Sequence, residues 1–217
     1  VFRTRRPVYV GASSATGFME GALRNGVRRR VLSLVNGAFS ERFHAIARAC
    51  GLNADRLDVP WGDAHTPELL TAALAGGDFD TVSIVHSETS TGVLNPIAEL
   101  TRAALAAGDV AVLVDSVTGV AGAPLETDDW QLDFVLTGSQ KSLALPPGLA
   151  LGVAAESLLS RARANPACPS CPTAAKPATA VRMHWRNGHW RNQAYGKRAE
   201  LRKLVWIEPT LVAAVIH

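Results

Sequence analysis

A single lysine, Lys141, is the candidate for amine chemistry, because it is the only lysine in the first 160 residues. The permanent cations in the rest of that stretch are arginines, which stay protonated at physiological pH and cannot act as amine nucleophiles. Lys141 follows the strand-forming run Phe134–Leu136 and the turn signal Gly138-Ser139. The run Leu143–Gly148 after it predicts a partly apolar setting, which favours the uncharged amine that a Schiff base needs. A solvated surface lysine is the alternative.

A carboxylate, Asp115, directly follows the five apolar residues Val110–Val114. An unpaired carboxylate buried at the end of such a strand costs several kcal/mol, so Asp115 requires a partner. A cationic ring nitrogen, an arginine or a helix N-terminus would serve.

Three further polar turns follow predicted strands. The small residues Ser13–Gly17 lead into a helix, and their N–H and hydroxyl groups could bind a phosphate. An ordinary helix cap is the alternative, and the turn matches neither a Walker loop nor the dinucleotide-binding glycine pattern. Phe39 follows the turn Asn36-Gly37 and could stack on a flat ligand or belong to the core. The segment His86–Gly92 is dense in hydroxyl groups.

The elements that position these residues alternate between strands and helices. Strands that are apolar throughout indicate a mostly parallel sheet covered on both faces, which is an α/β fold of three layers, α/β/α. In such sheets ligands bind at the carboxyl ends of the strands, where all the polar turns fall. The expected strands are residues 7–10, 31–35, 57–60, 81–85, 110–114, 133–136 and 149–153. The expected helices are residues 18–25, 40–50, 66–75 and 96–107.

Together the strand ends supply a phosphate cradle, a ring-stacking side chain, hydroxyl donors, a buried carboxylate and one amine. Pyridoxal 5'-phosphate requires this set: the amine for an imine, the carboxylate for the pyridine nitrogen, and donors for the phosphate and the phenolic oxygen. A protonated pyridine ring then withdraws electrons from the substrate, and the Asp115 carboxylate would keep the ring nitrogen protonated.

Four motifs in order resemble the class V aminotransferases, and most of all their alanine–glyoxylate and serine–glyoxylate (serine–pyruvate) branch. The resemblance runs from about Val8 to about Ser160. The motifs are VNGAFSER at 35–42, HSETSTGVLNP at 86–96, VDSV at 114–117, and GSQKS at 138–142 with PPG at 146–148.

The resemblance implies a role for each matched residue. Lys141 would form the Schiff base and carry the proton between the substrate carbon and the cofactor. Asp115 would pair with the pyridine nitrogen, Thr89 would bond the phenolic oxygen, and Phe39 would stack on the ring. The phosphate would be bound by Ser14, Ala15, Thr16 and Gln140. His86 and Glu88 receive no catalytic role, and Glu88 is expected to be structural.

The chain departs from the family at both ends. It begins without methionine and close to the first strand, which suggests a fragment, and no likeness to the family's C-terminal small domain follows Ser160. We therefore expect a partial large domain at residues 1–160 and an atypical basic tail, poorly packed or disordered, at residues 161–217. The charge supports this division, because the first part holds 12 Lys and Arg against 17 Asp and Glu, and the tail holds 10 against 2. A frame-shift or an unrelated graft would explain the tail.

The expected function is transfer of an amino group from a small amino acid, alanine or serine, to glyoxylate or pyruvate, in a homodimer. The alternatives are other chemistry on the same fold, such as cysteine desulfuration, and a non-catalytic remnant whose basic tail contacts nucleic acid. A desulfurase needs a reactive loop cysteine and usually a histidine at the position of Phe39. Nucleic-acid binding is disfavoured, since the positive charge belongs to the tail alone.

The cysteines and the hydropathy of the chain bear on metal sites, membrane spans and the cellular compartment. Cys50 is expected to be a small buried residue, and Cys168 and Cys171 form one CxxC with prolines beside it and no second pair. No metal site is expected. The chain holds no run of 18 apolar residues, so no membrane span is expected, and a reducing cytoplasmic compartment fits the cysteines.

Overall fold

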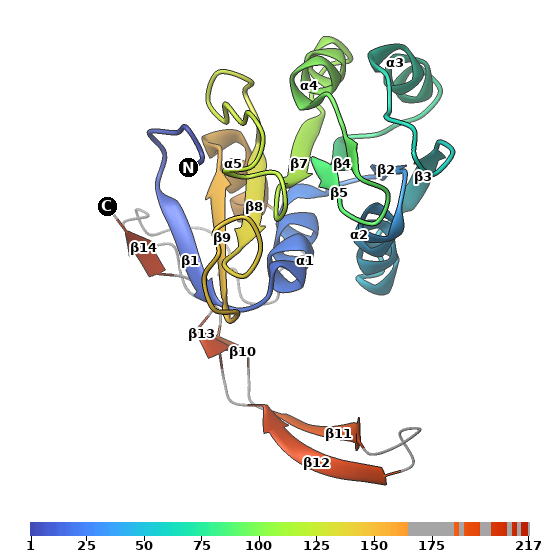
Figure 1. Cartoon of the computed structure of the whole chain (residues 1–217). Helices are drawn as coiled ribbons and strands as arrows, with labels where there is room; N and C mark the ends of the chain where they lie inside the picture. The colour runs from blue at the N-terminus through green and yellow to red at the C-terminus, as the bar shows by residue number, and fades with distance from the viewer. Residues whose placement is uncertain (165–184, 187–188, 196–200, 208–209, 212–213, 217) are drawn as a thin grey trace.

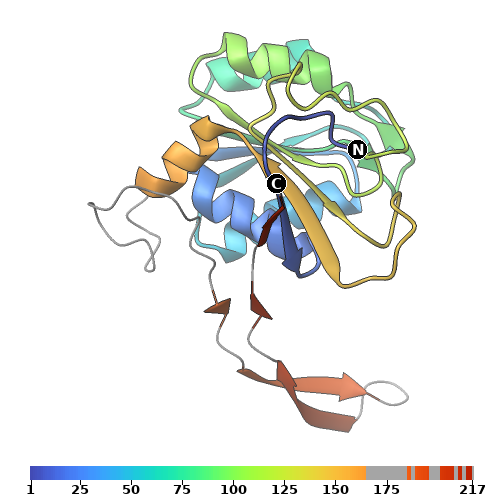
Figure 2. The same ribbon diagram turned by 90° about the vertical axis from the view of Figure 1, so that its left-hand side faces the viewer.

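The computed structural model describes residues 1–164, 185–186, 189–195, 201–207, 210–211 and 214–216. A single large sheet runs through the body and helices cover both of its faces, as Figures 1 and 2 show. The strand order is β14-β1-β9-β8-β7-β4-β2-β3. The α/β fold with three layers is confirmed.

Most neighbouring strands of this sheet run parallel. The strands β8, β7, β4, β2 and β3 are parallel to one another, whereas β9 lies antiparallel between β8 and β1. A short hairpin, β5 (Ser87–Glu88) with β6 (Val93–Leu94), follows β4. The sheet strands of the body are β1 (Val8–Ala12), β2 (Val31–Val35), β3 (Ala54–Asp58), β4 (Thr81–Val85), β7 (Ala111–Asp115), β8 (Phe134–Gly138) and β9 (Leu149–Ala154).

The helices divide between the two faces of the sheet. Helices α1 (Ala15–Gly26), α2 (Ala38–Ala49) and α5 (Glu156–Ala164) cover one face, and α3 (Pro67–Ala75) and α4 (Ile97–Ala106) cover the other. Each face of the sheet packs against its helices in a separate hydrophobic core, and strand β7 contributes side chains to both. Leu113 belongs to the core under α1, whereas Val112 and Val114 belong to the core under α3 and α4. Within the described part of the chain, no helix is long and apolar enough to cross a bilayer.

The expected elements are present, with shifted boundaries. Helix α1 begins at Ala15 instead of Phe18, because Ser14 is already extended as the N-cap and the small residues after it join the first turn. Strand β3 begins at Ala54 instead of Leu57, and it forms one edge of the sheet. Helix α3 begins at Pro67, and Thr66 is its N-cap, with its hydroxyl accepting the N–H of Leu69 at 3.4 Å. Cys50 is the C-cap of α2 and is only half-buried, so its expected burial is incomplete.

The end of the chain contributes further strands. Helix α5 continues past residue 160 to Ala164, and β14 (Ala214–Ile216) pairs antiparallel with β1. Two short ladders join β10 (Trp185–Arg186) to β13 (Thr210–Leu211) and β11 (His189–Tyr195) to β12 (Leu201–Ile207). Cys168 and Cys171 lie outside the described residues, and the division of the chain at residue 160 stays a prediction.

Arg161 anchors α5 to the amino ends of two central strands. Its guanidinium is buried, donates to the backbone oxygens of Asp80 (2.6 Å) and Asp109 (2.9 Å), and forms ion pairs with both carboxylates. The Asp80 carboxylate also accepts the backbone N–H groups of residues 28–30 at 3.0 to 3.2 Å. Asp80 therefore joins α5, β4 and the turn before β2.

We expect Arg161→Met to lower the free energy of unfolding by about 3 kcal/mol, because it leaves the buried Asp80 carboxylate without its cation. Urea unfolding measures the change. The matched control is Arg163→Met on the same helix, whose ion pair with Glu156 is exposed, and which should lose less than about 0.5 kcal/mol. Equal losses in the two variants would contradict the anchoring role of Arg161.

Candidate active site

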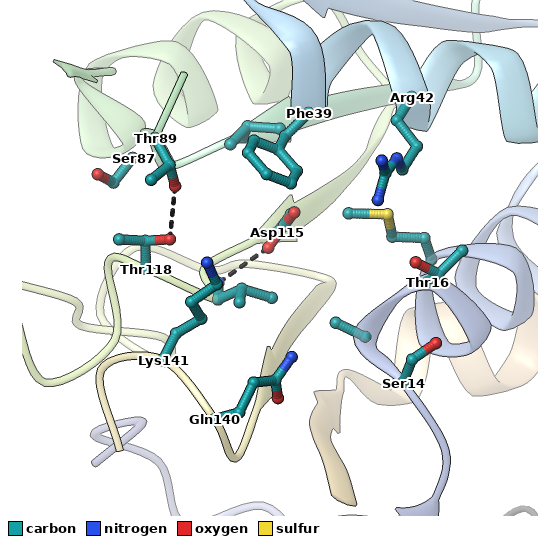
Figure 3. A pocket seen from close by; sticks show the side chains of 14 residues that line it. Ser14, Thr16, Phe39, Arg42, Ser87, Thr89, Asp115, Thr118, Gln140 and Lys141 are labelled. Atoms are coloured by element: carbon teal, nitrogen blue, oxygen red, sulfur yellow. Dashed lines mark hydrogen bonds between the residues drawn. The ribbon is translucent and has the colours of Figure 1, made fainter. Parts of the chain in front are cut away.

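One pocket at the carboxyl ends of the strands collects every residue that the sequence analysis selects. The pocket holds about 550 Å³ of open space, part of it continuous with solvent. Figure 3 shows side chains from α1, α2, the β5–β6 loop, the end of β7 and the loop after β8 pointing into it. The eight expected residues that line it are Ser14, Ala15, Thr16, Phe39, Thr89, Asp115, Gln140 and Lys141.

The N-terminus of α1 forms one wall of the pocket. Ser14 is the N-cap residue, as the helix-cap alternative expects, but its hydroxyl makes no capping hydrogen bond. Ser13 donates its hydroxyl to the Ser14 carbonyl at 3.1 Å, and a Cβ at Gly17 would lie 2.3 Å from that same Ser13 oxygen. Glycine at 17 thus lets Ser13 fold beneath the turn, while the hydroxyls of Ser14 and Thr16 stay exposed at the pocket.

Asp115 ends β7 in the centre of the sheet. Its side chain is 4% exposed and accepts one hydrogen bond, from the Val117 N–H at 2.8 Å. No Lys, Arg or His of the described residues forms an ion pair with it. Burial, with a smaller contribution from the Glu88 carboxylate, raises the pKa of Asp115 to about 7. Asp115 is therefore a buried acid at the pocket, without a cationic partner among the described side chains.

Glu88 holds α2 and thereby places Phe39. The Glu88 side chain is fully buried and accepts the N–H groups of Phe39 (3.2 Å) and Ser40 (2.8 Å) at the start of α2. Burial raises its pKa, but hydrogen bonds from Ser90, Ser40 and Phe39 outweigh burial and lower it. A Cβ at Gly37 would lie 2.4 Å from Glu88 Cγ, so only glycine permits this approach. The structural role expected for Glu88 agrees with these contacts.

Lys141 reaches the pocket from the loop between β8 and β9. Ser139, buried at the base of this loop, donates its hydroxyl to the Pro146 carbonyl at 2.6 Å and so closes the loop. Lys141 itself is exposed. The apolar cover expected from the run after Lys141 is absent, because residues 144–149 are exposed and Leu145 is 54% exposed. Apolar side chains of the pocket that Lys141 lines come instead from Met19, Phe39 and Val85.

Several pocket residues were missed by the sequence analysis: Met19, Arg42, Val85, Ser87, Val117 and Thr118. Arg42 places its guanidinium carbon 5.4 Å from the centre of the Phe39 ring, which braces the ring from the same helix face. The three-residue spacing of Phe39 and Arg42 in a helix was a usable signal. His86 lies outside the pocket, bonds Ser116 Oγ at 3.0 Å, and has a pKa that burial lowers to about 4.

The body of the chain is similar to known aminotransferases. An uncharacterized aminotransferase of Methanocaldococcus jannaschii is 40% identical over 153 residues, which are 69% of this chain and 40% of that protein. The serine–glyoxylate aminotransferase of Methylorubrum extorquens is 36% identical over 67% of this chain and 38% of its own length. The solved alanine–glyoxylate aminotransferase of a Nostoc species has a TM-score of 0.71 at 28% identity, covering 75% of this chain and 44% of that one.

Two other comparisons give less information about the family of this chain. A cysteine desulfurase of Escherichia coli has a TM-score of 0.59 at 16% identity, covering 71% of this chain and 40% of that one, and so shows the shared fold alone. The model of the AcrVA2-like, anti-CRISPR type V subtype A2 family matches residues 137–214, which is less than half of the chain and lies mostly beyond the body. Neither decides the family of the body.

The fold and the pocket place the body of the chain in the aminotransferase class. Within that class, the body of the chain belongs to the class V family, whose curated members here include serine–glyoxylate aminotransferases at 31 to 36% identity. The chain spans about 40% of the length of the Methanocaldococcus jannaschii and Methylorubrum extorquens relatives.

We expect Asp115→Asn to stabilise the protein at neutral pH and much less in acid. The unfolded carboxyl titrates near 3.8 and the folded one near 7, so between these values the folded state retains a proton that the unfolded state has lost. Wild-type stability therefore falls as pH rises through this window, by up to about 4 kcal/mol, and the variant escapes the fall. Urea unfolding of both proteins from pH 5 to pH 8 measures the difference. The contribution of His86 to the pH dependence of stability is the same in wild type and variant, so it cancels in the difference. A stability difference that does not vary with pH would contradict the raised pKa of Asp115.

We expect Glu88→Gln to lower the free energy of unfolding by about 2 kcal/mol, because a neutral amide oxygen accepts the α2 N–H groups less strongly and its NH₂ group meets other donors. Thermal or urea unfolding reports the loss. Glu41→Gln, in the first turn of the same helix but half-exposed and paired with Arg56, is the control and should change little. Comparable losses in both variants would show that the helix dipole, and not the Glu88 contacts, is responsible.

Proposed function

We propose that this chain is the large domain of a pyridoxal-phosphate-dependent aminotransferase that moves the amino group of a small amino acid, alanine or serine, to glyoxylate or pyruvate. The observation that carries the proposal is the shared pocket of Lys141 and Asp115, an amine and a buried acid without a protein cation. The named relatives that act on glyoxylate support the choice of acceptor.

The residues present fit the cofactor. The buried carboxyl of Asp115 is complementary to a protonated pyridine nitrogen, which would compensate its burial and hold it ionised. The uncapped N-terminus of α1, with Ser14, Ala15 and Thr16, suits the phosphate, and Gln140 lies at the same pocket. On the remaining sides, Phe39 offers a ring face and Thr89 a hydroxyl to the phenolic oxygen.

When bound, the cofactor supplies an electron sink for the bond that is broken at the substrate α-carbon. Lys141 would hold the cofactor through its Nζ atom and, when free, would carry a proton at Nζ. Asp115 would be kept ionised by a protonated pyridine nitrogen, because a nearby cation lowers the proton affinity of a carboxylate. Phe39, braced by Arg42, fixes the plane of the ring.

Two expectations accompany the proposal and stay predictions: a homodimer and a cytoplasmic location. The desulfurase alternative finds less support. Cys50, the cysteine of the described body, does not line the pocket, and Phe39 occupies the position where a desulfurase usually places histidine. The remnant alternative concerns the tail, whose side chains beyond Ala164 are not among those that the structure describes.

Addition of pyridoxal 5'-phosphate to the purified 217-residue chain should produce a visible absorbance band near ~420 nm. Lys141→Ala should abolish the band, and Asp115→Ala should weaken it, because the ring loses its counter-ion. Borohydride reduction followed by peptide mass analysis should place the cofactor on Lys141.

The control is Lys203→Gln, a lysine of the tail, which should leave the band unchanged. A band that remains in Lys141→Ala would overturn the proposal. If the band depends on Lys141 but alanine does not bleach it, the cofactor site stands and transamination of alanine is overturned. Serine is then tested in the same way.

A further inference from the structure

The turn Val117-Thr118, which follows Asp115, contacts three of the expected site residues or their neighbours. The Val117 N–H donates to the Asp115 carboxylate at 2.8 Å. The Thr118 hydroxyl lies 2.7 Å from the Thr89 hydroxyl, and the Thr118 carbonyl accepts the hydroxyl of Ser142, which directly follows Lys141. One turn thus contacts the acid, the hydroxyl and the loop that carries the amine, and Figure 3 shows Thr89 above Thr118 on the side where Lys141 enters.

The contact between Thr89 and Thr118 is between hydroxyl groups alone. Each hydroxyl has one proton and two acceptor positions, and the pair shares one of the two protons. When Thr118 donates, the Thr89 oxygen is held as an acceptor on that side, and its own proton is free to point into the pocket. Without Thr118, the Thr89 hydroxyl loses this fixed direction and turns toward water or its own backbone.

Neither backbone depends on this pair for its position. Thr89 lies in the loop of the β5–β6 hairpin, whose Gly92 N–H donates to the Glu88 carbonyl at 2.8 Å. The turn at Thr118 is held by the Val120 N–H, which donates to the Ser116 carbonyl at 2.9 Å, and by the bond from Ser142. Loss of the Thr118 hydroxyl should therefore redirect one side chain and leave the fold unchanged.

We propose that Thr118 is a positioning residue, whose hydroxyl donates to Thr89 and so aims the Thr89 proton at the phenolic oxygen of the cofactor. The inference rests on the proposed function. It assigns to Thr118 a role through Thr89 and no contact with the cofactor or the substrate.

The test compares Thr118→Val, which keeps the shape and removes the hydroxyl, with Thr118→Ser, which keeps the hydroxyl. Two properties of the bound cofactor are measured in the full chain: its dissociation constant and the pH titration of its visible band. A proton donated to the phenolic oxygen favours the form with more negative charge there, so its loss should raise the apparent pKa of the band. We expect Thr118→Val to raise that pKa and to weaken cofactor binding about 3- to 10-fold. Thr118→Ser should restore both properties.

Thr89→Val supplies the coupling control. It should reproduce the shift of Thr118→Val, and the double variant should shift no further, because both substitutions remove the same donated proton. Urea midpoints of all variants should match wild type. Equal shifts in Thr118→Val and Thr118→Ser, additive shifts in the double variant, or a wild-type titration in Thr118→Val would each overturn the inference while the proposed function stands. A wild type without a Lys141-dependent band overturns both.

Discussion

The burial of Asp115 is the constraint on which the pocket depends. A carboxyl group at the end of the central strand β7, with one N–H donor and a nearby second carboxylate, is held in its neutral form up to about pH 7. The two apolar cores on either side of β7 exclude water from it and so create the unfavourable environment. The same packing that stabilises the sheet therefore leaves this acid in an environment that the positively charged ring of the proposed cofactor would relieve, so stability and the proposed binding oppose each other at this one residue.

Around this acid, hydrogen bonds between distant segments fix the positions of the other groups. Glu88 reaches across 48 residues to the start of α2, and Asn95 joins the Val85 carbonyl (2.7 Å) to Asn36 (3.2 Å) and to the His65 N–H (3.1 Å). These polar side chains are buried, and none of them lines the pocket. The strand ends are thus connected to one another by side chains as well as by the sheet, which keeps the loops that carry Phe39 and Thr89 in one arrangement.

The sequence predicts the outline of this architecture because its signals are local. Apolar strands, capped helices and the rule that ligands meet the carboxyl ends of parallel strands suffice to bring Ser14, Phe39, Asp115 and Lys141 to one edge of the sheet. Other features depend on contacts between residues far apart in the chain. Arg161 is buried only because Asp80 and Asp109, 81 and 52 residues earlier, lie at neighbouring strand ends.

Local signals fail for two further features. The exposure of Lys141 depends on the path of the loop before β9, where hydrophobic composition suggested cover that the folded loop does not provide. The hydroxyl pair of Thr89 and Thr118 joins two loops 29 residues apart, each of which looks like an ordinary polar turn in the sequence.

Among the described strands of the sheet, β1 comes first in the sequence, whereas its partner in the body, β9, follows all the parallel strands. Until β9 arrives, the nascent chain carries β1 with both of its edges unpaired. Pairing strands so distant in sequence is slow, because a long loop must close before any contact rewards it. The backbone groups of β1 therefore stay without their partner in the body until nearly all of the body has been synthesised.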